Sequence, residues 1–314
     1  MTNTIKLSTF DVTSIKIGTS NVDAVYVGAE KVYPSSTPPH DYSQDYLTFV
    51  ATESGTFKFS GNSINYSIDS GATWTSLASN TSTPTISAGN TIMWKGTLTP
   101  STRGIGSFSA TNTFVVQGNT MSLLYGDNFS GQTSLPDKAF MYMFSGCTNM
   151  ESTENIVLPA TTMSASGYAY MFDTCSSITK LPNLPATTLA PHCYRTMFAR
   201  CSSVASIPND YLPVTTLKEA CYINMFYSCT SLTASPLLPA TTLVKQCYQG
   251  LFYNCSRLNT ITCLATSISA SNCTAQWVSS VASSGTFIKA ANMSSWGSCG
   301  ANKIPCNWTV QNYS

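Results

Sequence analysis

Charged side chains are scarce in this 314-residue chain. Asp, Glu, Lys and Arg together make up 9% of it, and the formal net charge is +1. Because nucleic-acid binding draws its affinity from clustered positive charge, this composition argues against a nucleic-acid partner. Ser and Thr supply 88 residues, more than a quarter of the chain. Hydroxyl groups must therefore keep the surface hydrated, which is more typical of β-rich, repetitive proteins than of cytosolic enzymes.

Long apolar runs are also missing. No stretch approaches the roughly 20 residues that cross a bilayer as a helix, so we expect no membrane insertion. The first residues, from Met1 to Ser8, lack a basic segment followed by an apolar run. We therefore expect no secretory leader.

Residues suited to acid–base chemistry are rare. The chain has two histidines, His40 in a Pro-rich stretch and His192, and neither stands in a recognisable catalytic or metal-binding motif. The 14 acidic residues show no evident general acid–base pair, and no glycine-rich phosphate loop is present. We therefore expect no enzyme, no cofactor and no metal site. A glycan hydrolase stays an open alternative, because the carboxylates of such enzymes come from distant positions.

The first 42 residues form two parts. Residues 1–34 carry alternating apolar side chains between Gly-containing breaks, which predicts a β segment of three or four short strands. So short a segment cannot bury enough apolar surface by itself, so we expect it to dock onto another protein. Residues 35–42 are polar and Pro-rich and are predicted to be a stiff linker.

Residues 43–128 are predicted to form a β-sandwich-like domain, because short candidate strands follow one another at regular spacing. The expected strands are 46–51, 55–60, 64–68, 73–77, 91–94, 106–110, 113–116 and 122–125.

One motif in this domain matches the Asp-box of sialidase-type propellers, S-x-D-x-G-x-T-W. Its residues are Ser67, Asp69, Gly71 and Trp74. In such a turn the Asp and Ser side chains bind backbone amides and the Gly supplies the turn. Propellers carry several boxes and repeat whole blades, so a single copy favours a structural turn over a sialidase site.

From about residue 129 the chain repeats itself. Five phenylalanines lie 28, 26, 28 and 26 residues apart, and each precedes a cysteine by three positions. Self-similarity of this kind predicts a solenoid over residues 129–282, in which each repeat buries its apolar face against its neighbours. The recurring residues are Phe144, Phe172, Phe198, Phe226 and Phe252 with Cys147, Cys175, Cys201, Cys229 and Cys255.

Each repeat is expected to contain two kinds of segment. The near-helical spacing of apolar residues in 217–229 predicts a short helix. The recurring Leu-Pro-Ala-Thr-Thr segment predicts an extended stretch, with Pro at a strand start. Residues 283–314 are expected to cover the open end of the solenoid as a C-terminal cap hairpin. The predicted fold class is therefore mainly β with short helices.

The repeated cysteines have three candidate roles. Their paired spacing of eight residues does not fit closed zinc sites. Adjacent rungs bring equivalent residues close enough for disulfides, but free Cys also fills a buried stack of small apolar side chains. We favour the buried stack and treat the Phe and Cys positions as a structural ladder. Cys299 and Cys306 lie outside this ladder and are its exceptions.

A tyrosine also recurs once per repeat, at Tyr168, Tyr194, Tyr222 and Tyr248. A row of Tyr on one face stacks well on sugars, because the ring is apolar while the hydroxyl stays hydrated. These four residues are therefore a candidate ligand face. The competing interpretation is that they pack between neighbouring rungs.

The recurring Phe-x-x-Cys-x-x-Leu core resembles leucine-rich repeats of the BspA type over roughly residues 129–282. The order of parts is a β head ending in Val25-Tyr-Val-Gly-Ala-Glu-Lys-Val-Tyr-Pro34, a β domain, the repeats and a tail. This order resembles virion proteins of tailed phages that infect Bacteroides-type gut bacteria, crAss-like phages among them. The resemblance implies a structural head or tail fibre or appendage, located in the virion and assembled in the host cytoplasm.

The same resemblance implies the partners. Residues 1–34 would anchor the chain to other virion proteins of the capsid or tail, and the repeats would touch a glycan or protein on the host surface. Fibres of this kind are dimers or trimers, so we expect a homo-oligomer. Two alternatives stay open. One is a bacterial surface adhesin of the BspA type, which needs an export signal. The other is the glycan hydrolase that the Asp-box suggests.

Overall fold

The computed structural model describes residues 16–17, 20–21, 25–27, 30–33, 40–294 and 296–314. It contains two compact units, Met1–Asp41 and Tyr42–Ser314. The described residues are mainly β, with one short α-helix. Within the part of the chain that is described, no helix has the length and apolar character needed to cross a bilayer.

The first unit contains two small antiparallel hairpins. Strand β1 (Lys16–Ile17) pairs with β2 (Ser20–Asn21), and β3 (Val25–Val27) pairs with β4 (Glu30–Tyr33). These strands fall within the segment for which the sequence predicts three or four. Residues 1–15 of the predicted β segment, and most of the linker 35–42, lie outside the described residues.

The second unit begins with two sheets. The larger has six strands in the order β12-β11-β5-β9-β7-β8, and the smaller pairs β10 with β6. All neighbouring strands are antiparallel except β11 and β12, which are parallel. The bounds are β5 Leu47–Ala51, β6 Phe57–Phe59, β7 Ile64–Ser67, β8 Thr75–Leu77, β9 Thr91–Lys95, β10 Phe108–Ala110, β11 Phe114–Asn119 and β12 Met150–Val157.

An aromatic core joins the two sheets. The fully buried Phe49 of β5 has its ring centroid 5.3 Å from that of Phe57 on β6 and 4.9 Å from that of Phe108 on β10. In β6 the two Phe are buried and Lys58 between them is exposed, as the alternation of side chains along a strand requires. Seven of the eight strands that the sequence predicts in this region, β5 to β11, are confirmed at their predicted positions.

The eighth predicted strand, 122–125, is wrong. These residues form the α-helix α1 (Ser122–Tyr125), which follows β11 in the chain and precedes the 3₁₀ turn η2 (Gly126–Asn128). A second 3₁₀ turn, η1, spans Tyr42–Gln44. Ser122, Leu123 and Leu124 are all buried, which a half-buried strand with a side-chain period of two does not allow. The Ser122 hydroxyl donates to the carbonyl of Trp94 at 2.9 Å, so this turn is tied across the end of the sheet.

The short helix predicted in each repeat is also wrong. In 217–229 the chain makes consecutive four-residue turns, with left-handed φ angles of 51°, 55° and 58° at Ala220, Asn224 and Ser228. Alternate N–H groups bond within the run, as Met225 does to the Tyr222 carbonyl, while the others bond to the next repeat. The buried residues of these turns recur every four positions. Over so short a segment that spacing hardly differs from the 3.6-residue period of an α-helix, which is why the sequence pattern predicted one.

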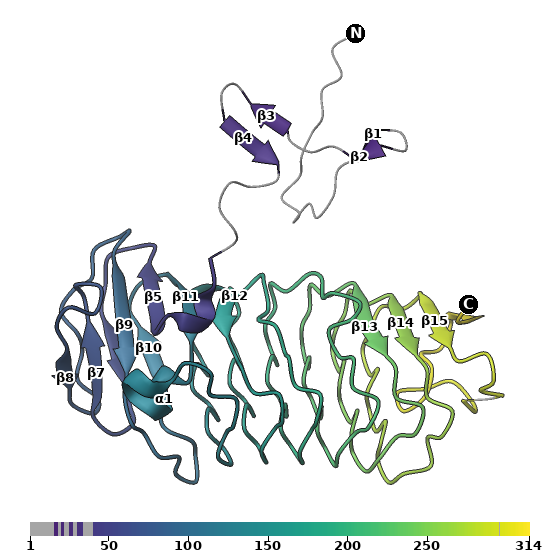
Figure 1. Cartoon of the computed structure of the whole chain (residues 1–314). Helices are drawn as coiled ribbons and strands as arrows, with labels where there is room; N and C mark the ends of the chain where they lie inside the picture. The colour runs from purple at the N-terminus through teal and green to yellow at the C-terminus, as the bar shows by residue number, and fades with distance from the viewer. Residues whose placement is uncertain (1–15, 18–19, 22–24, 28–29, 34–39, 295) are drawn as a thin grey trace. The chain divides into compact units, whose positions relative to one another are not determined.

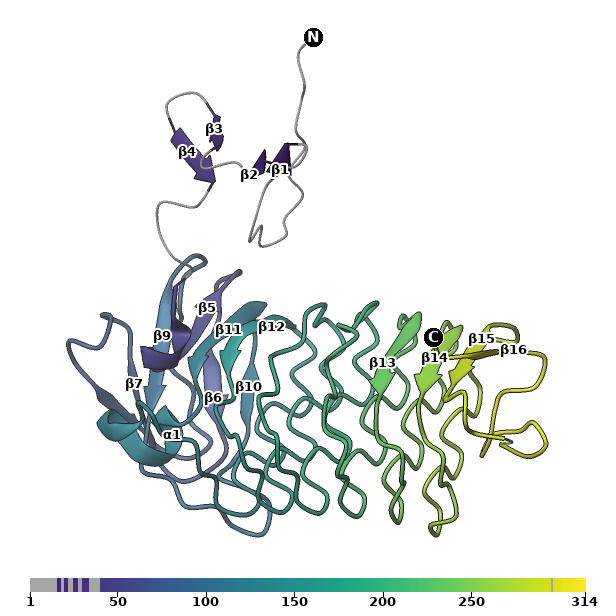
Figure 2. The same cartoon turned by 45° about the vertical axis from the view of Figure 1, so that its right-hand side comes forward.

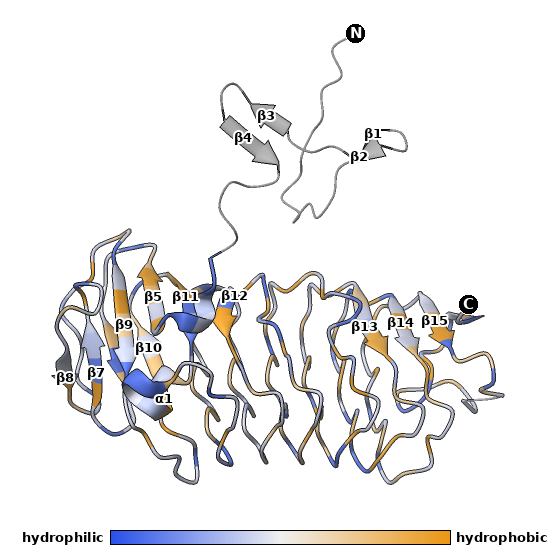
Figure 3. Ribbon diagram, viewed as in Figure 1, coloured by the Kyte–Doolittle hydropathy of each residue, from blue (hydrophilic) through white to orange (hydrophobic). Residues whose placement is uncertain are grey.

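The backbone segments of successive repeats lie side by side (Figures 1 and 2). The five repeated Phe rings stack with centroids 5.5–6.0 Å apart and planes within 10° of parallel. Phe108 of β10 stacks on the first of them, Phe144, at 5.6 Å. The core of the two sheets therefore continues into the repeats without a break. In Figure 3, strands β5, β12 and β13 each contain strongly hydrophobic residues, drawn in orange.

The last repeats add a parallel sheet. It runs β13 (Ala234–Leu238), β14 (Thr260–Cys263), β15 (Thr286–Lys289) and β16 (Thr309–Asn312), each strand paired with the next. Because β15 and β16 are parallel, the hairpin predicted over 283–314 is wrong. The chain instead adds one more strand to the same ladder. Cys299 and Cys306, in the connection between these strands, form a disulfide.

Candidate functional site

The Phe and Cys positions that the sequence assigns to a ladder lie in the core. All five cysteines are free and buried. Four of these thiols donate to the carbonyl of the ladder Phe one repeat earlier, as Cys255 does to Phe226 at 3.0 Å. The first, Cys147, donates to the carbonyl of Phe108 on β10 at 3.2 Å. Burial raises the pKa of the Cys147 and Cys255 thiols to about 12. With pKa values so far above neutral these thiols are protonated at pH 7, and a buried thiol is a poor nucleophile.

The candidate ligand face of four tyrosines is wrong. The side chains of Tyr168, Tyr194, Tyr222 and Tyr248 are at most 2% exposed. Their rings stack on one another with centroids 5.9–6.2 Å apart. They form a second buried column beside the Phe column, so no sugar reaches them. The repeat spacing alone could not separate a row that faces the core from one that faces solvent.

The Asp-box residues form a closed turn between β7 and β8. The Asp69 carboxylate accepts hydrogen bonds from the Thr73 amide at 2.9 Å and the Thr73 hydroxyl at 2.6 Å, and the Ser67 hydroxyl donates to it at 2.7 Å. The Gly71 amide donates to the Ser67 hydroxyl at 2.8 Å. The bond from the Thr73 hydroxyl is the main reason that the pKa of Asp69 falls to about 2. So weak a base with its oxygens occupied serves the turn and not proton transfer.

Trp74, the last residue of the motif, fastens this turn to the sheet. The ammonium of Lys95 lies 4.2 Å from the centroid of its ring, and the Tyr46 ring meets it edge-on at 4.9 Å. Lys95 and the Tyr46 hydroxyl both bond to Asp127, at 2.7 and 2.6 Å. Burial, and then the bond to Asp127, raises the pKa of Tyr46 to about 12. The contacts among these four side chains hold the turn against the sheet.

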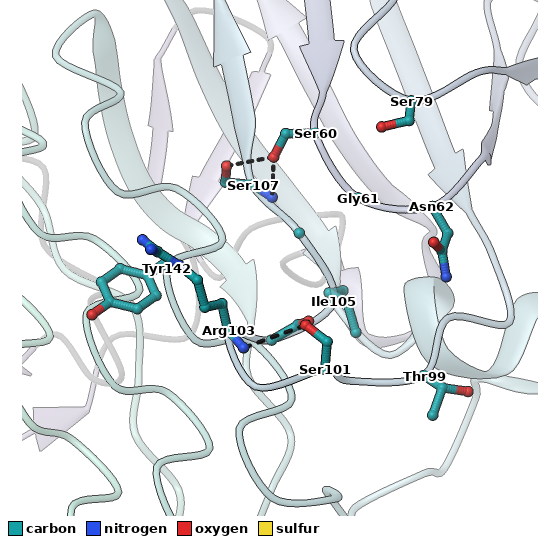
Figure 4. A pocket seen from close by; sticks show the side chains of 12 residues that line it. Ser60, Gly61, Asn62, Ser79, Thr99, Ser101, Arg103, Ile105, Ser107 and Tyr142 are labelled. Atoms are coloured by element: carbon teal, nitrogen blue, oxygen red, sulfur yellow. Dashed lines mark hydrogen bonds between the residues drawn. The ribbon is translucent and has the colours of Figure 1, made fainter.

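A polar hollow of about 500 Å³ lies where two loops of the β region meet the first repeat. Loop residues 60–62 and 99–107 form its walls, and Tyr142 comes from the first repeat. Figure 4 shows Arg103 and Tyr142 together at one side, with Asn62 and Thr99 across the hollow from them. The Ser60 and Ser107 hydroxyls bond to each other at 2.8 Å. Sequence reasoning missed this site.

Two glycines allow the loops to approach so closely. Gly104 has φ +86°, and a Cβ there would lie 2.5 Å from the Met141 carbonyl oxygen. Gly106 has φ +131°, and its Cβ would lie 2.5 Å from the Cα of Gly61. Any other residue at these positions would push the loops apart and distort the floor of the hollow.

A column of four side chains runs from the hollow along the repeats. The Arg103 guanidinium lies 5.0 Å from the Tyr142 ring centroid, Tyr142 stacks on Tyr170 at 4.6 Å, and the Arg195 guanidinium lies 5.5 Å from Tyr170. Partial burial, followed by the nearby Tyr170, raises the pKa of Tyr142, although both arginines oppose the shift. Tyr142 and Tyr170 both stand two positions before a ladder Phe, and that alignment could have revealed the pair.

The chemistry of the hollow suits binding. The residues that line it supply hydroxyls, an amide, a guanidinium and one phenol, and none is a carboxylate, an imidazole or a thiol. Across the described residues, no group of three or more His, Cys, Asp or Glu is placed to hold a metal ion. No protein-family model, curated protein or solved structure matches the chain.

Proposed function

We propose that the chain is a structural, surface-binding protein of a phage virion, a head or tail fibre or appendage. In this proposal residues 1–34 dock onto capsid or tail proteins, the chain forms a homodimer or homotrimer, and the repeats are a BspA-type leucine-rich-repeat solenoid. The solenoid carries a binding surface toward a glycan or protein of the host. Assembly takes place in the host cytoplasm.

One observation carries the binding part of this proposal. The repeats hydrogen-bond to one another through every second N–H of their turn runs, as Tyr222 does to Cys247 at 3.2 Å and Phe226 to Leu251 at 3.0 Å. Such a rod contacts only its neighbours along the stack and is suited to holding a binding site away from an attachment point. The hollow at its junction with the β region is lined by hydroxyls, an amide and a guanidinium that can hydrogen-bond to a ligand, and its lining contains no carboxylate, imidazole or thiol.

The virion assignment is tested by mass spectrometry of purified phage particles, with the copies per particle counted. We expect the chain at a fixed copy number, and deletion of residues 1–34 should abolish its incorporation while leaving a soluble, folded remainder. A high copy number would indicate a capsid fibre, and a low one a tail appendage. Absence from particles, or normal incorporation of the truncated chain, would overturn the assignment.

A bacterial surface adhesin is the second candidate, and the Cys299–Cys306 disulfide favours it. Disulfides persist in oxidising surroundings outside the cytoplasm, where an exported adhesin would reside. Surface labelling of intact bacterial cells separates the two candidates, because an adhesin is labelled on uninfected cells and a virion protein is not.

A further inference from the structure

We infer that the hollow beside Arg103 is a binding site for an acidic saccharide, in which the Arg103 guanidinium holds the sugar carboxylate. This inference rests on the proposed surface-binding function and names the class of ligand that the site takes. Three features of the hollow carry it: an unpaired positive charge, a preorganised guanidinium and a lining of neutral hydrogen-bonding groups.

The charge comes from Arg103, which is exposed and forms no ion pair with any described residue. Among the residues that line the hollow there is no acid to neutralise it. Asp173, whose charge acts on Tyr142, is itself paired with Arg200. Arg195, at the far end of the column, adds a second positive charge. An anionic ligand is therefore favoured over a cationic one.

A ring contact restricts Arg103 before any ligand arrives. The central carbon of its guanidinium lies over the Tyr142 ring, 5.0 Å from the centroid, and Tyr142 in turn is backed by Tyr170. A stacked guanidinium keeps its N–H edge free for a carboxylate, which Arg binds through two parallel hydrogen bonds. Less side-chain entropy is lost on binding because the contact with Tyr142 already restricts the side chain. Tyr142 is thus a positioning residue for Arg103.

The remaining lining suits a polyhydroxylated ligand. Within the described part of the chain, the Asn62 amide and the Thr99 hydroxyl have no hydrogen-bond partner, so both are available to sugar hydroxyls. Ser60 and Ser107 bond to each other and still have acceptor capacity. The volume of about 500 Å³ lies within the range of small-molecule sites, about 300–1,000 Å³.

Calorimetric titration of the purified full-length chain tests the inference. The probes are tetragalacturonate and 3′-sialyllactose, each beside its carboxyl-reduced counterpart. We expect at least one acidic probe to bind, and its reduced form to bind about tenfold more weakly or not at all. Arg103→Gln should cause the same loss. Arg257→Gln, at an exposed arginine of a distant repeat, is the matched control and should leave affinity unchanged.

Two variants of Tyr142 test its positioning role. Tyr142→Phe keeps the stacked ring and should bind like the parent chain, whereas Tyr142→Ala should weaken binding by several-fold and leave the reduced probe unaffected. Because Arg103 is exposed, we expect Arg103→Gln to unfold at the same temperature as the parent chain. A thermal melt checks that the variant is folded.

The outcomes separate this inference from the proposed function. Failure of both acidic probes to bind, or equal binding of acid and reduced forms, overturns the inference whatever the particle analysis finds. Loss of affinity in Arg257→Gln as large as that in Arg103→Gln also overturns it. Arg103-dependent binding by a chain that is absent from phage particles supports the saccharide site and removes the virion assignment.

Discussion

The β region and the repeats are both built on aromatic cores, but they pack their rings in opposite ways. Around Phe49 the neighbouring rings meet at angles from 41° to 79°. Along the repeats, ladder Phe rings lie within 10° of parallel. The first core is a set of unlike contacts made once, and the second is one contact made repeatedly. The varied packing of the β region goes with loops of differing shape, two of which line the hollow. The uniform packing of the repeats gives a regular scaffold.

The largest effect is expected when the repeated contact is broken at its centre. Phe198→Ala removes a buried ring that stacks on Phe172 and Phe226, and should lower the free energy of unfolding by about 3–5 kcal/mol. Because repeats stabilise mainly their neighbours, amide exchange should rise most in the adjoining repeats and less in β5 and β9. Denaturant unfolding and hydrogen exchange measure both. A uniform rise across both regions would contradict the comparison.

A smaller effect is expected from a single hydroxyl in the repeats. The buried Tyr211 hydroxyl donates to the Pro182 carbonyl at 2.8 Å. Tyr211→Phe leaves that carbonyl without its donor and should cost about 1–2 kcal/mol. Tyr66→Phe in the β region is the matched control. Its hydroxyl makes no side-chain hydrogen bond to the described residues, so little change is expected. Urea melts of the two variants give the difference, and equal costs would show that the bond contributes nothing.

The ladder thiols report where the repeats open first. Ten cysteines are free and buried in the native chain, and burial raises the pKa of those such as Cys255 to about 12. Labelling at neutral pH should therefore be slow in the folded chain and complete once it is denatured. Mass spectrometry of digests should find Cys273, near the end of the repeats, labelled before the central Cys201. Simultaneous labelling would indicate that the repeats open as one unit.

The smallest effect is expected from the turn that contains Asp69. This turn belongs to the β region and has no counterpart in the repeats. Its pKa is about 2 in the folded chain against a usual 3.8. A carboxyl with a lowered folded-state pKa stabilises the fold above its unfolded pKa, and this is lost as the pH falls from about 4 to about 2. Asp69→Asn should remove that part of the acid dependence. Thermal melts across this range measure it, and an identical profile in the variant would contradict the assignment.

The strands of the β region were predictable because alternating burial is a local property of the sequence, as Phe57 and Phe59 around Lys58 illustrate. The Phe and Cys ladder was predictable because its period is long and regular. The helix in 217–229 was not excluded, since a four-residue period over three turns hardly differs from 3.6. The face of Tyr222 was not predictable, because burial depends on which side of the turn run the next repeat covers.

The sequence by itself determined that the chain is β-rich, that its second half repeats, and that the repeats share one apolar column. These properties follow from the composition and from the spacing of apolar residues. Such patterns involve residues that are close in the chain or that occupy the same position in successive repeats. Only the tertiary structure decided that Arg103 lies against Tyr142 and that loops 60–62 and 99–107 enclose a hollow. Those contacts join segments with no common pattern, and they form only because the aromatic core between the sheets and the first repeat holds them in place.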